Sequence, residues 1–322
     1  MSAATEVLRD DVAWAVAIFA SRETPVELLA TLDATLAAAQ KPTLIDILIN
    51  GNGALAETFS KRLESTATSK NAATVRVWSI GVGDKANAWN QYVHRIWSAG
   101  RSVFFMDGYV RPDPDALALL EAGMVSAPDV LGATGIPRAG SSAARQRRQM
   151  LEKGGLHGNL YCLRSATMEA IRKTPFYLPL GIYRTDSILG AALKFNLDPA
   201  HNQWKPERVQ VNPDAGWDTR IKNWWRLSDI KSQLKRILLQ ARGDLENRAF
   251  RHRFAIKKSS LPELPRTASA LVLSWAASCP EDARLIIRRN MFSGWALKKL
   301  KKPRDWDGAN DAPRLVCTRV LH

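Results

Sequence analysis

Between residues 14 and 217, short apolar runs alternate with stretches in which apolar residues recur every three or four positions. The strands that this alternation predicts span residues 14–19, 44–49, 75–80 and 102–106, and the clearest helices span residues 25–39 and 85–99. Alternation of this kind is typical of βαβ units. We therefore expect an α/β domain built on a mostly parallel, mixed sheet flanked by helices.

Polar residues follow the apolar runs. Ser21, Asn50, Gly81 and Asp107 each lie at or just after the end of a predicted strand. Open α/β sheets bind ligands outside the carboxyl ends of their strands, so a functional site is expected at that edge. Burying the charge of Asp107 at the end of a buried strand costs free energy unless its carboxylate meets a cation or a hydrogen-bond donor, which favours a functional role. The alternative is that it belongs to a turn or caps the following helix.

Five segments of the chain carry a common pattern, and the first four of them contain Ser21, Asn50, Gly81 and Asp107. They are FASRETPVELLATLDATL (19–36), DILINGNG (46–53), GVGDKANAWN (81–90), FFMDGYVRPDPDAL (104–117) and LPLGIYRTDSILGAAL (178–193). In order and spacing they resemble the motifs of family 2 glycosyltransferases, which have the GT-A nucleotide-sugar-binding fold. The resemblance covers about residues 14–217.

The resemblance implies inverting transfer of a sugar from a nucleoside diphosphate sugar, with a UDP-sugar favoured, to a hydroxyl of a glycan or lipid-linked acceptor. It makes Asp186 the candidate general base, since inversion needs one carboxylate and forms no covalent sugar intermediate. It makes Asp107 the ligand of a divalent cation, Mn²⁺ or Mg²⁺. The candidate donor-binding residues are Ser21, Glu23, Asn50, Lys85, Asp107 and Tyr109.

Three positions depart from the family pattern. Tyr109 stands where the second carboxylate of the Asp-x-Asp motif is usual, so we expect weak cation binding without nucleotide. Asn50 replaces the usual Asp of the second strand, which changes the hydrogen bonds offered to a nucleoside base. In the triplet Arg184-Thr185-Asp186, only the last acid remains.

Four candidate residues also have an ordinary structural explanation. Asp186 could cap a helix beginning at Ser187. Lys85 opens a helix where a phosphate or base could bind, or it is a solvated surface lysine. His157 and Arg138 are candidates for contacts with a diphosphate, a metal or an acceptor; the alternatives are a hydrogen-bonded loop histidine and a solvated loop arginine.

The basic residues gather in the last third of the chain. The net charge is +15, and residues 219–258 hold twelve Lys or Arg against three Asp or Glu. Residues 284–304 hold eight basic residues and no acid, so the rest of the chain is nearly neutral. Within residues 219–242, apolar side chains recur at helical spacing between the cations, which predicts a basic amphipathic helix.

Such a helix is typical of attachment to an anionic membrane surface. The expected contacts are Lys222, Trp224, Trp225, Arg226, Lys231 and Lys235. The alternative is that the apolar face packs on the catalytic domain. No secretory signal is readable, the longest apolar run is too short for a span, and three scattered cysteines suit a reducing compartment. We therefore expect a cytoplasmic protein, peripheral on the inner face of the membrane.

Two other functions remain open. A nucleic-acid-binding protein would suit the high charge, but the charge is confined to one third and no known motif is present, so nucleic acid is not an expected partner. A catalytically silent member that binds a sugar nucleotide or glycan is suggested by Tyr109. The expected organisation is a GT-A-like catalytic domain at 1–217 and a basic, mainly helical extension at 218–322.

Overall fold

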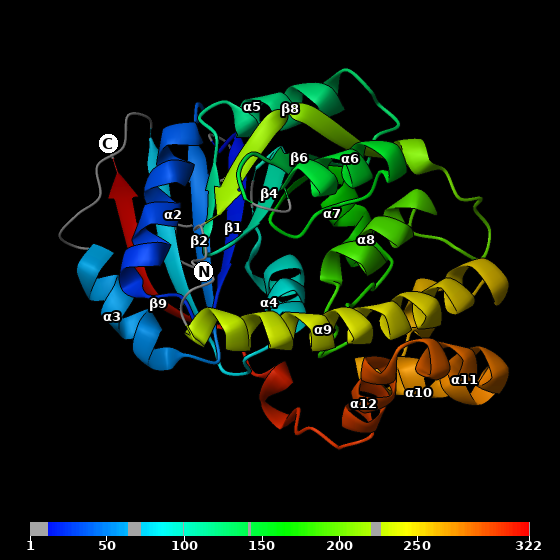
Figure 1. The fold of residues 1–322 in the computed structure, drawn as a ribbon. Coiled ribbons are helices and arrows are strands. Elements are labelled where there is room, and N and C mark those ends of the chain that lie inside the picture. The colour runs from blue at the N-terminus through cyan, green and yellow to red at the C-terminus, as the bar shows by residue number, and fades with distance from the viewer. Residues whose placement is uncertain (1–11, 64–71, 99, 141–142, 220–226, 322) are drawn as a thin grey trace.

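One sheet organises the structure. The computed structural model describes residues 12–63, 72–98, 100–140, 143–219 and 227–321, with the backbone alone for 227–236. The strands are β1 (Trp14–Ala20), β2 (Thr43–Asn50), β3 (Ala73–Ile80), β4 (Ser102–Asp107), β5 (Val110–Pro112), β6 (Gly132–Pro137), β7 (Leu160–Arg164), β8 (Val209–Thr219) and β9 (Arg314–Leu321). They form a nine-stranded sheet in the order β5-β8-β6-β7-β4-β1-β2-β3-β9 (Figure 1).

The parallel part of the sheet lies at its centre. β1 pairs in parallel with both β2 and β4, and β2 pairs in parallel with β3. Every side chain of β1 and β2 is buried, as expected for strands covered by helices on both faces. The four predicted strands are confirmed to within two residues at each end. Towards β5 the sheet becomes mixed, because β7 is antiparallel to β4 while β6 and β8 are parallel to each other.

Two helical layers cover the sheet. Up to residue 219 the helices are α2 (Pro25–Ala38), α3 (Gly53–Leu63), α4 (Lys85–Gln91), the π-helical turn η1 (Tyr92–Ile96), α5 (Ala116–Val125), α6 (Ala143–Lys153), α7 (Ser165–Lys173), α8 (Thr185–Lys194) and the 3₁₀ turn η2 (Pro206–Arg208). α2, α3 and α5 pack into one core, and α4, α7 and α8 pack into the core on the opposite face. The predicted α/β architecture is confirmed.

The start of α2 shows how local sequence fixes one of these helices. Thr24 Oγ1 accepts a hydrogen bond from Glu27 N at 3.2 Å, and Glu27 Oε2 accepts one from Thr24 N at 3.0 Å. Pro25 occupies the first turn, where its missing N–H costs nothing. This reciprocal cap sets where α2 begins and therefore the path of the chain that leaves β1.

The last hundred residues are mainly helical and end in a strand. The described elements are α9 (Leu227–Arg251), η3 (His252–Ile256), η4 (Leu261–Glu263), α10 (Ala268–Ser278), α11 (Pro280–Arg289), α12 (Met291–Leu300), η5 (Asp307–Asn310) and β9. Buried side chains of α9, α10 and α12 join the same core as α4 and α8. β9 pairs antiparallel with β3 and so extends the sheet of the N-terminal region.

The predicted boundary between residues 217 and 218 falls inside β8, and this division into domains stays a prediction. Lys222, Trp224, Trp225 and Arg226 lie outside the described residues. The backbone at Lys231 and Lys235 is helical, but their side chains are also outside the description. No helix in the described ranges combines the length and the apolar character that a bilayer crossing requires.

Glu121 on α5 ties that helix to the opposite end of the sheet from the predicted site. Its carboxylate accepts hydrogen bonds from Trp14 Nε1 at 2.9 Å and Ser102 Oγ at 3.0 Å, and pairs with Lys41 Nζ at 2.5 Å. Burial opposes ionisation of Glu121, but these three donors outweigh it and lower the pKa of the carboxyl. The charged form therefore stabilises the fold.

Glu121→Gln should lower the free energy of unfolding at neutral pH by about 1–3 kcal/mol, because three donors lose a charged acceptor. The pKa of Glu121 is lowered on folding, so its contribution is present above the unfolded pKa of about 4.3 and is lost as pH falls through the folded value. Urea unfolding of both proteins at neutral pH and below pH ~4 measures this. A difference that stays constant with pH would contradict it.

Candidate functional site

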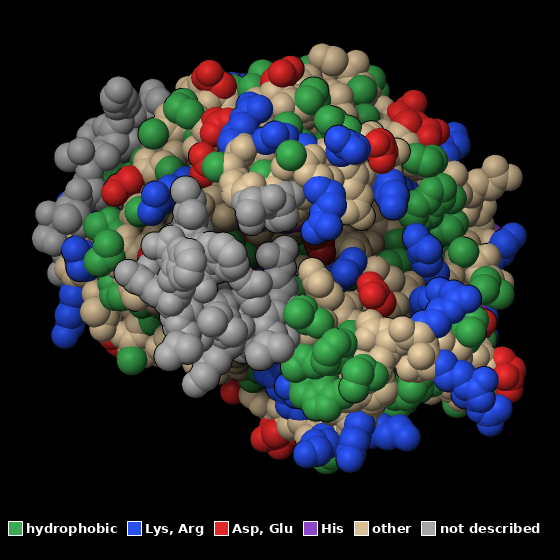
Figure 2. All heavy atoms as spheres, viewed as in Figure 1, with side chains coloured by type: hydrophobic (Ala, Val, Ile, Leu, Met, Phe, Trp, Pro, Cys, Tyr) green, Lys and Arg blue, Asp and Glu red, His purple; other side chains and the backbone are tan. Residues whose placement is uncertain are grey.

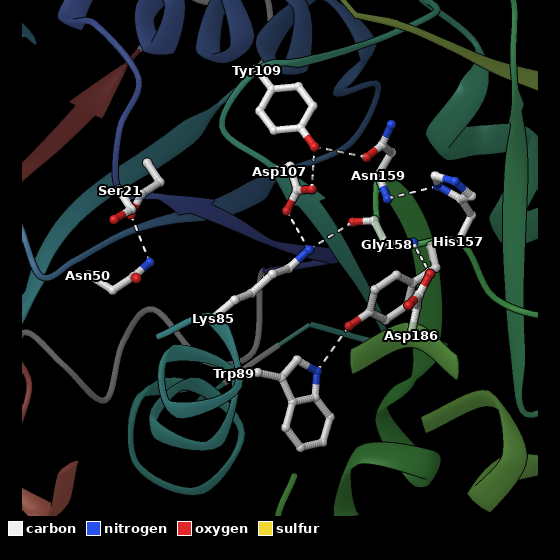
Figure 3. Close-up of polar contacts among 12 residues, drawn as sticks. Ser21, Asn50, Lys85, Trp89, Asp107, Tyr109, His157, Gly158, Asn159 and Asp186 are labelled. Carbon is white, nitrogen blue, oxygen red and sulfur yellow. Dashed lines mark hydrogen bonds and ion pairs between the residues drawn. The ribbon is translucent and has the colours of Figure 1, made fainter. Parts of the chain in front are cut away.

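The predicted site residues come from different elements that meet at the carboxyl edge of the sheet. Asp107 ends β4, Lys85 opens α4, and Asp186 lies in the first turn of α8. Figure 3 shows Lys85, Asp107 and Tyr109 pointing toward one another, with Asp186 on the far side of Gly158. Residues far apart in the sequence are thus brought together where strand topology leads us to expect a ligand.

Asp107 is bonded through both carboxylate oxygens. Oδ1 is paired with Lys85 Nζ, and Oδ2 accepts a hydrogen bond from Tyr109 Oη at 2.9 Å. Lys85 Nζ also donates to the carbonyl oxygen of Gly158 at 3.2 Å and lies 5.8 Å from the ring centroid of Phe19. The negative charge that the strand end exposes is therefore balanced by a lysine from the neighbouring helix.

Tyr109 occupies the position of the missing carboxylate and acts as a donor. Its side chain is 40% exposed, and its hydroxyl also lies 3.4 Å from Asn159 Oδ1. The negative charge of Asp107 and, secondarily, burial raise the pKa of Tyr109 well above its ordinary value. The phenol therefore stays protonated at neutral pH and cannot supply a second negative charge.

Gly158 separates Asp186 from the Lys85–Asp107 pair. Its N–H donates to Asp186 Oδ2 at 3.0 Å, while its carbonyl accepts the bond from Lys85. A Cβ added at Gly158 would lie 3.3 Å from Lys85 Nζ and 3.6 Å from Asp186 Oδ2. The absence of a side chain at Gly158 therefore leaves room for the cation and the second carboxylate to approach the same residue.

Asp186 does not cap its helix in the way considered from sequence. α8 begins at Thr185, and the residue at the cap position, Arg184, makes no side-chain cap bond. Asp186 Oδ1 accepts from the N–H of Ser187 at 3.0 Å. The carboxylate thus lies in the first turn of the helix, with its other oxygen toward Gly158.

Trp89 and Tyr161 form the buried floor next to these groups. Trp89 Nε1 donates to Tyr161 Oη at 2.9 Å, and the Tyr161 ring stacks on Phe105 with centroids 4.7 Å apart. Trp89 is 1% exposed, as expected for a core residue. This aromatic layer provides the rigid support from which Lys85, one turn earlier on α4, extends.

His157 and Arg138 lie on neighbouring loops with partners of their own. His157 Nδ1 accepts from Asn159 N at 3.2 Å, and its ring lies 5.1 Å from that of Trp217. Arg138 Nε pairs with Asp113 Oδ2 at 2.8 Å, against Gly216, where a Cβ would come within 2.0 Å of the same nitrogen. These contacts match the hydrogen-bonded loop histidine for His157, while Arg138 is ion-paired rather than simply solvated, and the predicted ligand contacts of both residues stay predictions.

Ser21, Glu23 and Asn50 shape the turns at the ends of β1 and β2. Asn50 Nδ2 donates to the carbonyl of Ala20 at 2.8 Å. Glu23 Oε2 accepts from the backbone N–H groups of Ser21 at 2.6 Å and Arg22 at 2.9 Å. These bonds hold the backbone of the site edge in place, and the role of the same residues in donor binding stays a prediction.

The loop that leads to Asp186 is held by α9, which sequence analysis did not include in the site. Glu246 Oε2 accepts from the backbone N–H groups of Tyr183 at 2.9 Å and Arg184 at 3.4 Å. Arg242 Nε pairs with Glu246 Oε1 at 2.8 Å, and its guanidinium also donates to the carbonyl of Gly181. The side chain of Glu246 is fully buried, and α9 holds the backbone of this loop at three residues, Gly181, Tyr183 and Arg184.

Burial raises the pKa of Glu246, while Arg242 and the two N–H groups oppose that shift. In sequence, Arg242 and Glu246 have only the four-residue spacing common on exposed helices, which does not distinguish a buried pair from a surface pair. Gly181 has a φ of +77°, which favours glycine, so the glycine at this position is a local sign in the sequence that the loop needs a special conformation.

Comparisons with known proteins support the fold. No protein-family model matches the sequence, and no curated protein matches it significantly. A mannosyltransferase from Pyrobaculum calidifontis, solved with GDP-mannose and Mn²⁺, matches with a TM-score of 0.53 at 13% identity, over 92% of this chain and 77% of that chain. Glucosyl-3-phosphoglycerate synthase from Mycobacterium tuberculosis, solved with Mn²⁺ and UDP, matches with a TM-score of 0.47 at 17% identity, over 74% of this chain and 80% of that chain. At such identities the first likeness shows the fold alone, an α/β fold of the GT-A kind.

Proposed function

We propose that this protein transfers a sugar, with inversion, from a nucleoside diphosphate sugar to a hydroxyl of a glycan or lipid-linked acceptor, in the manner of family 2 glycosyltransferases. A UDP-sugar is the favoured donor. The GT-A-like fold supports the donor class, since the mannosyltransferase of the same fold was solved with GDP-mannose. The sequence motifs at 81–90 and 104–117 support the family.

One observation carries the proposal. Asp186 and the Lys85–Asp107 pair contact the same residue, Gly158, from its N–H and its carbonyl side. A base and a cation are therefore close together but not bonded to each other. Transfer with inversion needs this combination, a base for the acceptor and a positive group for the departing diphosphate.

The proposed reaction is one displacement. Asp186 takes the proton of the acceptor hydroxyl while the oxygen of that hydroxyl forms a bond to the anomeric carbon. The bond between that carbon and the diphosphate oxygen breaks, and the diphosphate leaves with the bonding electrons. Lys85 stabilises the charge that develops on it. Asp107, bonded to Lys85, and Tyr109, bonded to Asp107, orient the ammonium before the donor arrives.

A catalytically silent, donor-binding protein is the second candidate, favoured by the phenol at position 109. A screen of UDP- and GDP-sugars for donor hydrolysis, each with a parallel calorimetric binding measurement, separates the two functions. Hydrolysis of one bound donor supports the enzyme. Binding of a donor with no hydrolysis, and no transfer to added glycans, supports the silent protein.

The residues present do not fit a resident metal ion. In the described part of the chain no group of three or more His, Cys, Asp or Glu side chains could hold one. Both oxygens of Asp107 already accept bonds, from an ammonium and a phenol. A hard divalent cation prefers several carboxylate oxygens. We therefore assign no step to a metal and propose that Mn²⁺ or Mg²⁺ enters only with the diphosphate, beside Asp107.

We also propose that the protein works in the cytoplasm, peripherally on the inner face of the membrane. The support is the charge distribution, since residues 219–258 and 284–304 hold the cationic excess. Basic residues next to an anionic leaflet attract it within about a Debye length, roughly 8–10 Å. A lipid-linked acceptor would be presented at that surface.

Asp186→Asn should reduce sugar transfer about a hundredfold or more, because the amide cannot accept the acceptor proton. Affinity for the nucleoside diphosphate should be unchanged, since the contacts of Asp186 are with Gly158 and Ser187 rather than with the Lys85–Asp107 pair. Transfer assays and calorimetry measure both quantities. Asp198→Asn, an exposed aspartate after α8, is the matched control. Near-normal turnover of Asp186→Asn would reject Asp186 as the base.

Glu246→Gln should reduce transfer about tenfold, since a base displaced by even 1 Å loses much of its effect. The amide cannot accept from both Tyr183 and Arg184 and also pair with Arg242, so the loop before Asp186 should shift. The acceptor KM and kcat should change while the affinity for the diphosphate is kept. Glu281→Gln, at an exposed position of α11, is the control. Unchanged kinetics per folded molecule, with only a lower melting temperature, would restrict Glu246 to a role in stability.

Mn²⁺ should bind weakly to the protein alone and appreciably only together with UDP or GDP, whose oxygens supply the missing ligands. Tyr109→Asp should strengthen binding without nucleotide by about tenfold or more, because it adds a carboxylate beside Asp107. Tyr109→Phe is the control that removes the hydroxyl and adds no charge. Paramagnetic titration of free Mn²⁺ measures these affinities. Tight Mn²⁺ binding by the unmodified protein without nucleotide would contradict the prediction.

A further inference from the structure

The outer face of α12 exposes large apolar side chains. Met291 is 79% exposed, Phe292 is 37% exposed and Trp295 is 45% exposed. Their spacing puts them on one side of the helix, next to each other. Soluble proteins rarely expose several large apolar side chains together unless a partner covers them.

Around this apolar group, the charged side chains of α12 and of the last turn of α11 are all positive, whereas the two acids of α11, Glu281 and Asp282, lie in its first turn. Lys298 and Lys299 are exposed one turn beyond Trp295, and Lys299 Nζ lies 5.1 Å from the Trp295 ring centroid. On α11, Arg288 and Arg289 are exposed beside Leu285, which is 45% exposed. We call this set the α11–α12 surface; it comprises Leu285, Arg288, Arg289, Met291, Phe292, Trp295, Lys298 and Lys299. No acid occurs between residues 284 and 304.

The opposite sides of these helices are anchored. Ala283, Ala296 and Leu300 are buried in the core that also contains α4, α8 and α10. Asn290 caps α12 by accepting a hydrogen bond from Phe292 N at 3.0 Å. The helices that carry the exposed side chains are therefore packed on the core through their other faces. The exposure of these side chains is not the result of an unpacked helix.

The chemistry of the surface identifies its partner. Apolar side chains with a Trp, bordered by cations, match a helix that inserts one face between headgroups while its cations meet lipid phosphates. A second copy of the chain would bring two positive surfaces together, which is unfavourable. Figure 2 shows Lys and Arg side chains along the lower right of the molecule, where Figure 1 places α10, α11 and α12.

We propose that the α11–α12 surface is where this protein docks on an anionic lipid bilayer, with Met291, Phe292 and Trp295 among the headgroups. The inference builds on the proposed peripheral location and is independent of sugar transfer. It assigns docking to described residues of the basic segment at 284–304, in addition to the contacts expected at 222–235. The structure describes no side chains for residues 222–235.

Flotation with vesicles tests the proposal. The full chain should float with vesicles of phosphatidylglycerol and phosphatidylcholine, and at least about tenfold less with phosphatidylcholine alone. Phe292→Ser with Trp295→Ser, and separately Lys298→Glu with Lys299→Glu, should each weaken binding about tenfold or more. Arg145→Glu with Arg148→Glu makes the same charge change on exposed residues of α6 and should float like the parent. A blue shift of tryptophan emission on binding should be smaller in Trp295→Phe.

Three results would overturn the proposal. They are a parent protein that does not float with anionic vesicles, α11–α12 variants that float like the parent, and equal losses for the α6 control. Charge reversal at Lys222, Arg226, Lys231 and Lys235 is the competing variant; loss of flotation in that variant alone assigns docking to the other segment and also rejects the proposal. Circular dichroism of each variant establishes that it is folded.

Donor binding and donor hydrolysis are measured in parallel without vesicles. A failure of the docking proposal can then be distinguished from a failure of the proposed function. Variants that lose flotation should keep the parent's affinity for UDP or GDP and its donor hydrolysis. If the parent protein floats with vesicles but binds no nucleotide, the proposed transferase activity is rejected and the proposed docking surface is retained. If the protein retains single-stranded nucleic acid at physiological salt and does not float, its partner is a nucleic acid and the proposal of docking on a bilayer is rejected.

Discussion

Burial of the central strands on both faces determines where polar chemistry can occur in this protein. β1 and β2 have no exposed side chain, so a charge inside them must be paired. Asp46 on β2 is such a charge, and its carboxylate accepts hydrogen bonds from Arg76 at 2.7 and 2.9 Å and from Trp78 Nε1 at 2.7 Å. The candidate site residues lie at the strand ends, where β4, α4 and α8 bring Asp107, Lys85 and Asp186 together.

Balance of charge distinguishes this edge from a typical metal site. In place of two carboxylates there is one carboxylate, one phenol and one ammonium, and the carboxylate is bonded to both of the other groups. A positive group of the protein itself, Lys85, is thus already paired with the carboxylate. In the proposed function, the diphosphate of the donor competes with Asp107 for Lys85, so donor binding would be coupled to rearrangement of this pair.

Short-range features were predictable from sequence and long-range contacts were not. The four central strands, the reciprocal cap of Thr24 and Glu27, and the polar strand ends follow from periodicity and local hydrogen-bonding rules. The pairing of β9 with β3, the bond of Tyr109 to Asp107 and the hold of Glu246 on the loop before Asp186 depend on tertiary packing. Propensity and spacing contain no information about which distant segment will arrive beside another. The role of α9 was missed for this reason.

The pairing of β3 with β9 has a consequence for how the chain folds. Val77 finds its partner in Cys317, across most of the length of the sequence. Contacts between such distant segments close slowly, because a long loop must lose entropy before any bond compensates for it. Until β9 arrives, β3 presents an open strand edge of the kind that recruits other chains. Newly made protein should therefore be most prone to aggregate in the interval before its last strand docks.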